Sequence, residues 1–298
     1  MMKRSKTMGE KVFDVCNIIL LAIVGFICFY PLWHVLCGSL SDPKLYNQHT
    51  GPILWPLGFS LRGYINVMAN PNIGIGYGNT LFYAGVGTLM RMLATIVGAY
   101  VLAQKHFMLR KPVTLMIVFT MYFSGGLIPN YLLVNALGLL NTRWALIIPA
   151  LITTWNMIIL KTSFQSVPES LVESARIDGA GDMRIMMQIV VPVSKASIAV
   201  ISLYYLVAEW NSWFHAAIYL PARRDCYPLQ LILRELLISD TANAALSDAA
   251  GVTDVEDILL ADIIRYATIC VSTLPIIAAY PFVQRYFVKG VMMGSVKG

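Results

Sequence analysis

Six long runs of apolar residues constrain this chain more than any other feature of its sequence. Only Arg91 and Glu209 interrupt these runs with a charge, and the runs cover residues 15–41, 81–104, 113–142, 144–160, 196–222 and 266–284. About 20 mostly apolar residues are enough for a helix to cross a bilayer, and the shortest run reaches that length if Asn141 or Lys161 lies near the interface. The sequence therefore predicts six transmembrane helices, in preference to five or seven.

The composition supports a membrane protein and excludes an ordinary soluble domain. The chain is 57% hydrophobic and 13% charged, and its mean hydropathy is +0.66, outside the balance of soluble proteins. The first apolar run follows Lys3, Arg4, Lys6 and Lys11, as the apolar part of a signal peptide would. Because the run is too long for a signal peptide and no small-residue cleavage site follows, we predict a retained first helix.

The basic residues are divided unequally between the two sides of the predicted membrane. With the N-terminus inside, fourteen of them fall in cytoplasmic segments and six in outer segments. Cytoplasmic segments of membrane proteins carry an excess of Lys and Arg. The sequence therefore predicts a multi-pass protein of the bacterial cytoplasmic membrane, in contact with lipid, with both termini in the cytoplasm. No basic patch interleaved with aromatic residues indicates a nucleic acid partner.

A polar segment separates the fourth apolar run from the fifth. Ser166 and Glu169 have the spacing of a capping box, and Pro168 falls where a first-turn proline is tolerated. These residues predict a helix that begins here and ends near Asp178. The segment is exposed to the cytoplasm in the predicted topology.

Two glycines predict a bend after this helix. Gly179 and Gly181 can adopt a left-handed C-cap without steric cost, and a second short helix from Asp182 is expected to end before Pro192. The two helices would form an elbow over residues 166–192. From the pattern alone, this elbow would either meet a soluble partner or lie on the lipid headgroups.

The sequence lacks the motifs of an enzyme. Its cysteines and histidines are scattered without metal-ligand or redox spacing. A glycine cluster at residues 74–78 lacks the strand, lysine and hydroxyl of a nucleotide-binding loop, and Asn79 and Thr80 after it are expected to cap the second span. We therefore predict no metal, no cofactor and no enzymatic activity, so that any ATP would be hydrolysed by another chain.

The elbow resembles the EAA signature of ABC importer permeases, a long and specific pattern. The matching residues are Glu173, Ser174, Ala175, Gly179, Ile189, Val191 and Pro192. Ser174 stands where the signature usually has alanine, a change between two small residues.

The resemblance extends over nearly the whole chain. It includes residues 79–81, 209–214 and the basic C-terminal segment 284–298. The chain is similar to the smaller, maltose-type permease of carbohydrate ABC importers, in the branch related to the LplC and YtcP permeases. An ABC permease for another solute and an ATP-independent secondary carrier are the alternatives, and the missing inverted hydropathy repeat counts against the carrier.

The resemblance implies an all-α membrane fold of six helices, five of which form a MetI-like core. It divides the chain into an N-terminal tail with the first helix and an outer segment (1–75), the importer core with the elbow (76–285), and a cytoplasmic tail (286–298). The elbow would be the coupling helix, which fits a groove in a cytoplasmic ATPase dimer. The residues implied in coupling are Glu173, Ser174, Ala175, Asp178, Gly179, Gly181 and Pro192.

Further partners follow from the same resemblance. A second permease would complete the path for a carbohydrate, expected to be an oligosaccharide, and a solute-binding lipoprotein would dock on the outer segments around 39–79 and 221–257. A solvated connector is the other interpretation of the later segment.

Polar groups inside spans are costly in lipid, so Arg91 and Glu209 would pair, pack against a neighbour or line the path. Trp210, Asn211 and Trp213 are further path candidates, because aromatic rings and an amide suit sugar rings and hydroxyls. Ordinary packing between helices is the alternative for all of them.

Overall fold

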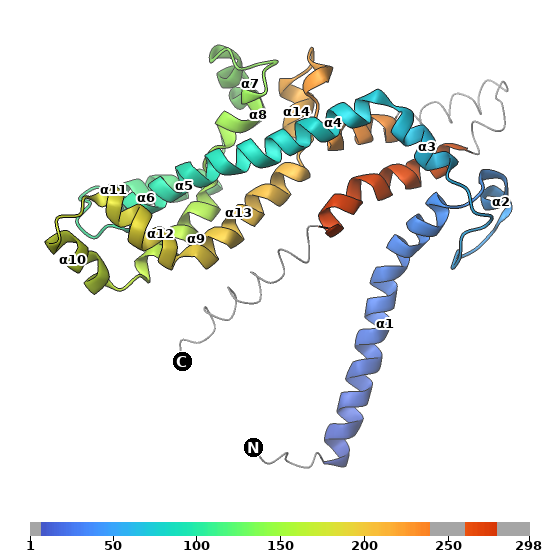
Figure 1. The fold of residues 1–298 in the computed structure, drawn as a ribbon, viewed down its shortest axis with the longest axis horizontal. Helices are drawn as coiled ribbons and strands as arrows, with labels where there is room; N and C mark the ends of the chain where they lie inside the picture. The colour runs from blue at the N-terminus through green and yellow to red at the C-terminus, as the bar shows by residue number, and fades with distance from the viewer. Residues whose placement is uncertain (1–6, 239–259, 279–298) are drawn as a thin grey trace. The chain divides into compact units, whose positions relative to one another are not determined.

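The computed structural model describes residues 7–238 and 260–278. These residues form helices joined by turns, with one isolated bridge between Ser41 and Phe59. The chain falls into two compact units, which are described separately: unit 1 comprises Met1–Asn70 and Leu236–Leu274, and unit 2 comprises Pro71–Glu235 and Pro275–Gly298 (Figure 1). The predicted all-α class is confirmed.

Three helices in the described part of the chain are long and apolar enough to cross a membrane, and they are Met8–Ser39, Pro71–Ala103 and Leu260–Ala278. Three further pairs of helices pass the same test together but are bent. These pairs are Arg110–Tyr122 with Leu127–Ala136 (117°), Trp144–Ala150 with Thr154–Gln165 (50°), and Asp182–Val193 with Lys195–Trp210 (85°). The predicted number of six spans is reached if each bent pair counts as one.

Unit 1 contains α1 (Met8–Ser39), α2 (Pro43–Gln48), α3 (Arg62–Ala69) and most of the helix Leu260–Ala278. Most large apolar side chains of α1 are exposed, as expected for a helix that contacts lipid or another subunit. Gly38 of α1 and Gly63 of α3 permit close packing on Leu260–Ala278. A Cβ atom at either glycine would lie within 3 Å of a side chain of that helix.

Unit 2 is built on one long helix made of α4 (Pro71–Phe82), the π-helical η1 (Tyr83–Gly87) and α5 (Thr88–Ala103). Two helices, α9 (Thr154–Gln165) and α13 (Lys195–Trp210), pack along α5. The core between them consists of buried apolar residues that include Met92, Ala99, Tyr100, Met157, Leu160, Phe164, Ile185, Met186, Ile201 and Tyr205. The apolar faces of these spans therefore face one another.

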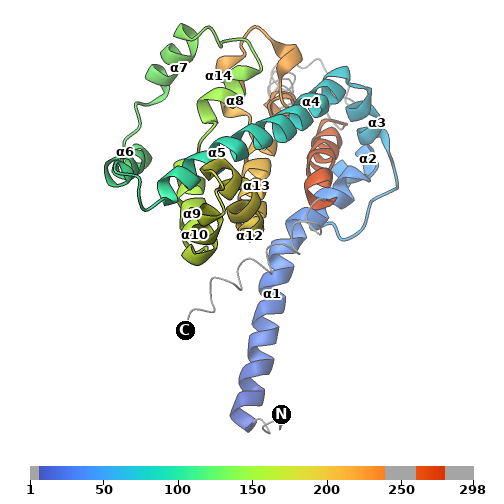
Figure 2. The same cartoon turned by 60° about the vertical axis from the view of Figure 1, so that its left-hand side comes forward.

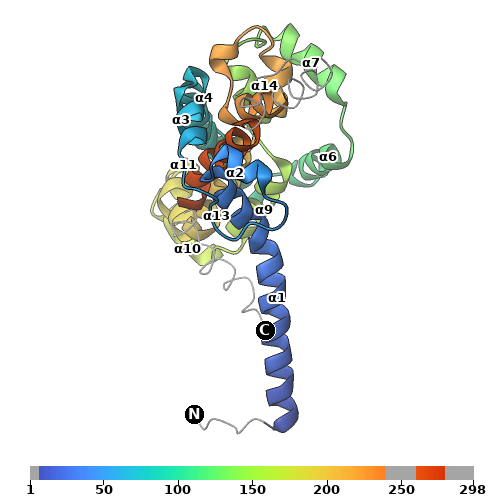
Figure 3. The ribbon, with the colours of Figure 1, turned by 90° about the vertical axis from the view of Figure 1, so that its right-hand side faces the viewer.

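The remaining elements of unit 2 lie beside this core or at its ends. They are α6 (Arg110–Tyr122), α7 (Leu127–Ala136), α8 (Trp144–Ile147) with the 3-10 turn η2 (Ile148–Ala150), α10 (Glu169–Ile177), α11 (Asp182–Ile185), the π-helical η3 (Met186–Val190), α12 (Val191–Val193), α14 (Phe214–Tyr219), the 3-10 turn η4 (Arg224–Cys226), and the helical residues 229–238, of which those up to Glu235 belong to unit 2. Figures 1, 2 and 3 place α10 at one end of the unit and α7 and α14 at the other.

The start of the second span differs from the prediction. Asn79 and Thr80 do not cap a helix but lie buried inside α4. The Asn79 amide donates to the carbonyls of Asp225 (2.7 Å) and Tyr227 (3.0 Å), and the Thr80 hydroxyl accepts from the Leu229 amide (2.8 Å). Both residues thus hold the segment after η4 against α4, a long-range contact that local capping rules do not foresee.

The glycine cluster at 74–78 is helical, because it lies within α4. At Gly76 the segment that begins at Leu229 crosses α4 so closely that a Cβ atom would lie 2.7 Å from Ile232 Cδ1 and 3.0 Å from Leu229 Cα. Gly76 therefore serves helix packing. This packing role agrees with the interpretation of residues 74–78 as a structural segment.

Candidate functional site

The first arm of the elbow is α10, which begins directly after Pro168. The predicted capping box is wrong, because α10 has no side-chain cap. Ser166 instead ends α9, and its hydroxyl donates to the carbonyl of Ser163 at 2.7 Å. The Ser-x-x-Glu spacing was satisfied, but the serine lies in the last turn of one helix rather than at the N-cap of the next.

Gly179 makes the bend of the elbow. Its φ of +79° lies in the left-handed region that favours glycine. The Gly179 amide donates to the Arg176 carbonyl (3.0 Å), and the Ala180 amide donates to the Ala175 carbonyl (2.9 Å). These two bonds are those of a Schellman C-cap. Gly181 has a φ of −72° and is the N-cap of α11, so only the first of the two predicted glycines needs its conformational freedom.

The second arm runs from α11 through η3 into α12 and does not end before Pro192. This prediction was wrong, because the helix continues as Asp182–Val193 and Pro192 lies in its last turn, directly after the π-helical η3. The chain then bends by 85° at Ser194 and continues as α13. The elbow is therefore connected to the core helix α13 by one short joint.

The predicted coupling residues divide between two faces of the elbow. The exposed ones are Glu173, Ser174, Asp178, Gly179, Gly181 and Pro192. Ala175 is half-buried and packs, with Val172, against the core of unit 2. No atom outside the local backbone lies within 4 Å of a Cβ built on Gly179 or Gly181, so the tip of the elbow is open to a partner.

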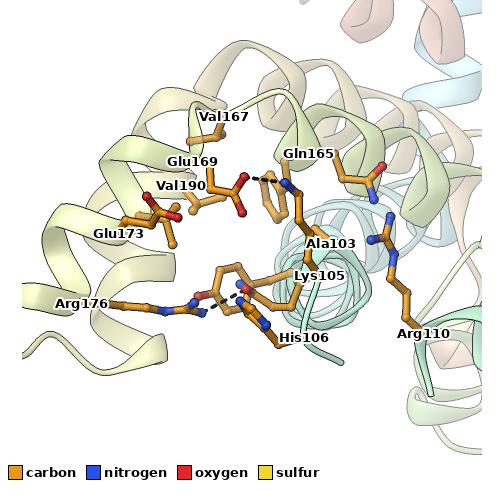
Figure 4. Close-up of a pocket in the computed structure, with 14 residues that line it drawn as sticks. Ala103, Lys105, His106, Arg110, Gln165, Val167, Glu169, Glu173, Arg176 and Val190 are labelled. Atoms are coloured by element: carbon orange, nitrogen blue, oxygen red, sulfur yellow. Dashed lines mark hydrogen bonds and ion pairs between the residues drawn. The ribbon is translucent and has the colours of Figure 1, made fainter. Parts of the chain in front are cut away.

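Polar contacts connect the elbow to the end of α5. Lys105 forms an ion pair with Glu169, and the Arg176 guanidinium donates to Gln104 Oε1 (3.2 Å) and Asp182 Oδ1 (3.3 Å). All of these residues except Asp182 line a cavity of about 400 Å³ between the elbow and the segment after α5, shown in Figure 4. The hydrogen bond and charge of Lys105 lower the pKa of the Glu169 carboxyl. Lys105 was not singled out from the sequence.

A buried ion pair lies in the interior of unit 2. Arg91 of α5 and Glu209 of α13 form this pair, and their side chains are only 8% and 4% exposed. Arg91 Nη2 also donates to the Leu146 carbonyl at 3.1 Å, and the guanidinium carbon lies 5.9 Å from the centre of the Tyr205 ring. The two charged side chains thus pair with each other. This pairing is one of the roles that the sequence analysis proposed for them.

Tyr205 is an interior polar residue that sequence reasoning missed. Its hydroxyl shares a hydrogen bond with Thr95 Oγ1 (2.8 Å) and accepts one from the Thr153 amide (3.3 Å). A signal was present, since Thr95 follows Arg91 by four residues and Tyr205 precedes Glu209 by four. Residues at that spacing share a helix face, so the four side chains form two facing pairs.

The other three path candidates lie in different environments. Trp210 is buried beside Tyr77, with ring centroids 6.4 Å apart. Asn211 is exposed at the end of α13, where its side chain donates to the Val207 carbonyl at 2.8 Å. Trp213 is half-buried at the start of α14. The five candidates therefore do not form one continuous lining within this chain.

No cluster of metal-ligating side chains is evident in the part of the chain that the structure describes. Residues 7–238 and 260–278 contain no group of three or more His, Cys, Asp or Glu side chains that could hold a metal ion. What the geometry offers is an exposed, rigidly bent elbow and a neutral, paired interior.

Comparison with known proteins identifies close relatives. No family model matches the chain. Protein LplC of Bacillus subtilis is 39% identical over 98% of this chain and 97% of its own length. The polygalacturonan/rhamnogalacturonan transport system permease protein YtcP of the same organism is 37% identical over 98% of this chain and 100% of its own.

One solved structure is also similar. It is a chain of a bacterial ABC transporter involved in the import of the acidic polysaccharide alginate, with a TM-score of 0.85 and 27% identity. The match covers 96% of this chain and 100% of that chain.

Proposed function

We propose a coupling role for the elbow, and the premise is that the chain belongs to the permease subunits of carbohydrate ABC importers. It is accordingly a multi-pass membrane protein and a transport subunit. In the proposed assembly a second permease completes the path, and a cytoplasmic ATPase dimer supplies the energy. A solute-binding lipoprotein delivers an oligosaccharide from outside.

The observation that carries the coupling role is the construction of the elbow. Its tip, with Asp178 and Gly179, and Glu173 in the middle of α10 are exposed and polar, whereas Ala175 and Val172 hold its inner face to the core. An exposed, polar and rigidly bent segment between two apolar spans suits a groove on a soluble partner. Glu173 would supply a charged contact and Gly179 the close approach.

A force on the tip would reach the core by two connections. The first is the continuous second arm, which leads through Pro192 into α13. The second is the ion pair between Glu169 and Lys105 at the end of α5. Coupling requires that the ATPase contacts differ between two states of the permease, and these connections would convert closure of the ATPase dimer into movement of α5 against α13.

The topology follows from this assignment. The elbow end of unit 2 faces the cytoplasm, together with both termini, and the end with α14 faces outward. Within the proposed path, Asn211 and Trp213 contact the sugar. Arg91, Glu209 and Trp210 are buried, so we assign them to the wall that holds α5 and α13 together.

The test is copurification of the tagged full chain from its native membranes in detergent. We compare the wild type with the double variant Glu173→Ala, Gly179→Asp, and use Arg224→Gln, an exposed charge at the opposite end of unit 2, as the control. The wild type and the control are expected to bring down a second permease and an ATPase, with ATP hydrolysis stimulated by the loaded binding protein.

The double variant is expected to lose the ATPase or its stimulation while keeping the second permease. Equal recovery of a stimulated ATPase with all three proteins would contradict the coupling role. Substrate transport by the purified chain alone, without any ATPase, would instead favour the secondary carrier.

A further inference from the structure

Arg234 stacks on Trp213 at the end of unit 2 opposite the elbow. Arg234 lies in the helix at 229–238, and its guanidinium carbon is 3.6 Å from the centre of the Trp213 ring. Arg234 is exposed and Trp213 is half-buried. The indole thus supports a guanidinium that solvent can reach.

The other described charged residues between Arg223 and Glu235 form ion pairs with one another and not with Arg234. Arg223 donates through Nε and Nη2 to the two carboxylate oxygens of Asp225, each at 2.8 Å. Arg224 pairs with Glu235 at 2.9 Å. Among the residues that the structure describes, no carboxylate pairs with Arg234. Within residues 7–238 and 260–278 it is therefore a cation placed on an aromatic ring rather than one member of an ion pair.

This arrangement is suited to a carboxylate ligand. Stacking on an indole fixes the plane of the guanidinium and leaves the N–H groups along its edge available. Two of those groups match the two oxygens of a carboxylate, in a charge-assisted, bidentate contact. A neutral sugar would gain little from a cation held in this way, whereas a sugar acid would gain both charge and orientation.

The position of the pair fits an entry point, an argument that rests on the proposed function. If the elbow faces the cytoplasm, α14, which begins directly after Trp213, lies on the side from which an importer receives its substrate (Figures 1 and 3). Two of the similar proteins are named for acidic polymers, polygalacturonan and alginate.

We infer that Arg234, held on the Trp213 ring, selects oligosaccharides that carry uronic-acid carboxylates as they enter the path. The carboxylate binds the edge of the guanidinium, and the exposed amide of Asn211, two residues before Trp213, is available to sugar hydroxyls. Arg234 is a specificity-determining residue, and its loss affects charged sugars alone.

The experiment measures ATP-dependent uptake by the complete importer in proteoliposomes. The probes are trigalacturonate and its fully methyl-esterified form, which has the same rings without the charges. Arg234→Gln is expected to lower kcat/KM for trigalacturonate by about tenfold, the loss of one charge-assisted contact, and to leave uptake of the ester unchanged. Arg234→Lys should restore part of the loss, because it returns the charge without the planar donors.

Arg224→Gln is the matched control, since it removes an exposed arginine of the same segment that is already paired. The inference is overturned if Arg234→Gln takes up trigalacturonate as the wild type does, or if it loses both probes equally. It also fails, with the proposed function intact, if the wild type takes up only the ester in an ATP-dependent manner. Absence of ATP-dependent uptake of both probes would also overturn the inference, and the copurification experiment above tests the proposed function separately.

Discussion

Two polar regions of unit 2, the elbow and the Arg91–Glu209 layer, satisfy their charges in opposite ways. The elbow carries its charges on the surface, and its ion pairs are exposed, with side chains that are 67% and 52% accessible in the pair of Lys105 and Glu169. The Arg91–Glu209 layer is almost fully buried. A buried pair is explained by the chain's own folding, whereas the exposed residues of the elbow are those to which we assign a partner.

This difference predicts that the two regions will respond oppositely to substitution. In the buried layer, a change should reduce stability first and transport only as a consequence. In the elbow, a change should leave stability nearly intact and reduce coupling. The size of the stability effect should therefore fall from the interior to the elbow.

The largest stability loss is expected for Glu209→Ala. The substitution leaves the guanidinium of Arg91 buried without its carboxylate, and breaking a buried pair in this way costs about 3–5 kcal/mol. Thermal unfolding of the purified complex in detergent measures the loss.

The double variant Arg91→Met, Glu209→Leu is the control, because it removes both charges and keeps the volume. It should recover most of the stability. If Glu209→Ala unfolded like the wild type but transported no sugar, the pair would belong to the path and the contrast between the two regions would be lost.

Tyr205→Phe should have the next largest effect. It removes the hydroxyl that shares a hydrogen bond with Thr95 and accepts one from the Thr153 amide. We expect the free energy of unfolding to fall by about 1–2 kcal/mol in the same assay. Adding Thr95→Val should cost little more, since the two changes remove one shared bond. Additive losses in the double variant would mean that the two hydroxyls act independently.

The order of the helices could be predicted from the sequence, because the apolar runs show where the spans lie. The ends of the helices could not be predicted in this way. Asn79 and Thr80 looked like local caps, and their partners lie about 150 residues away, at Tyr227 and Leu229. Local rules cannot separate these two uses of the same residue types. The break near Ser124 falls at Gly125 and Gly126, the second of which has a φ of +86°, and the break near Leu151 follows Pro149, so hydropathy alone does not show either break.

In the candidate site, the position of the bend could be predicted from the sequence, but the contacts that hold the elbow against the core could not. Gly179 was identified because a left-handed C-cap selects glycine, and the structure has it at φ +79°. The inner position of Ala175 and the ion pair between Lys105 and Glu169 depend on how the elbow folds back onto α5. Such contacts join residues 64 positions apart, which a single sequence does not reveal.

Gly179→Ala tests whether a change in the elbow affects coupling more than it affects stability. A side chain at this φ costs about 1 kcal/mol, and the open space around the glycine means that no clash adds to it. We expect a small fall in melting temperature and a larger loss of stimulated ATP hydrolysis.

Gly181→Ala is the matched control, because this glycine has an ordinary φ and equally open surroundings. It should be nearly silent in both assays. Equal effects of the two substitutions would show that the tip needs small residues for docking, and that the left-handed bend itself is not what matters.

The smallest stability effect is expected for Glu169→Gln. Lys105 lowers the pKa of this carboxyl from its ordinary 4.5, so any stability that the pair contributes is complete above that value and is lost as the pH falls through the lower, folded value. The difference in melting temperature between wild type and variant should therefore be small at pH 7 and vanish once the pH falls below the folded pKa of Glu169. Coupling should weaken at pH 7, because the variant loses one of the two connections between the elbow and the core. A variant that melts well below the wild type at pH 7 would place Glu169 with the buried layer, and the division between a self-sufficient interior and a partner-dependent elbow would then have to be redrawn.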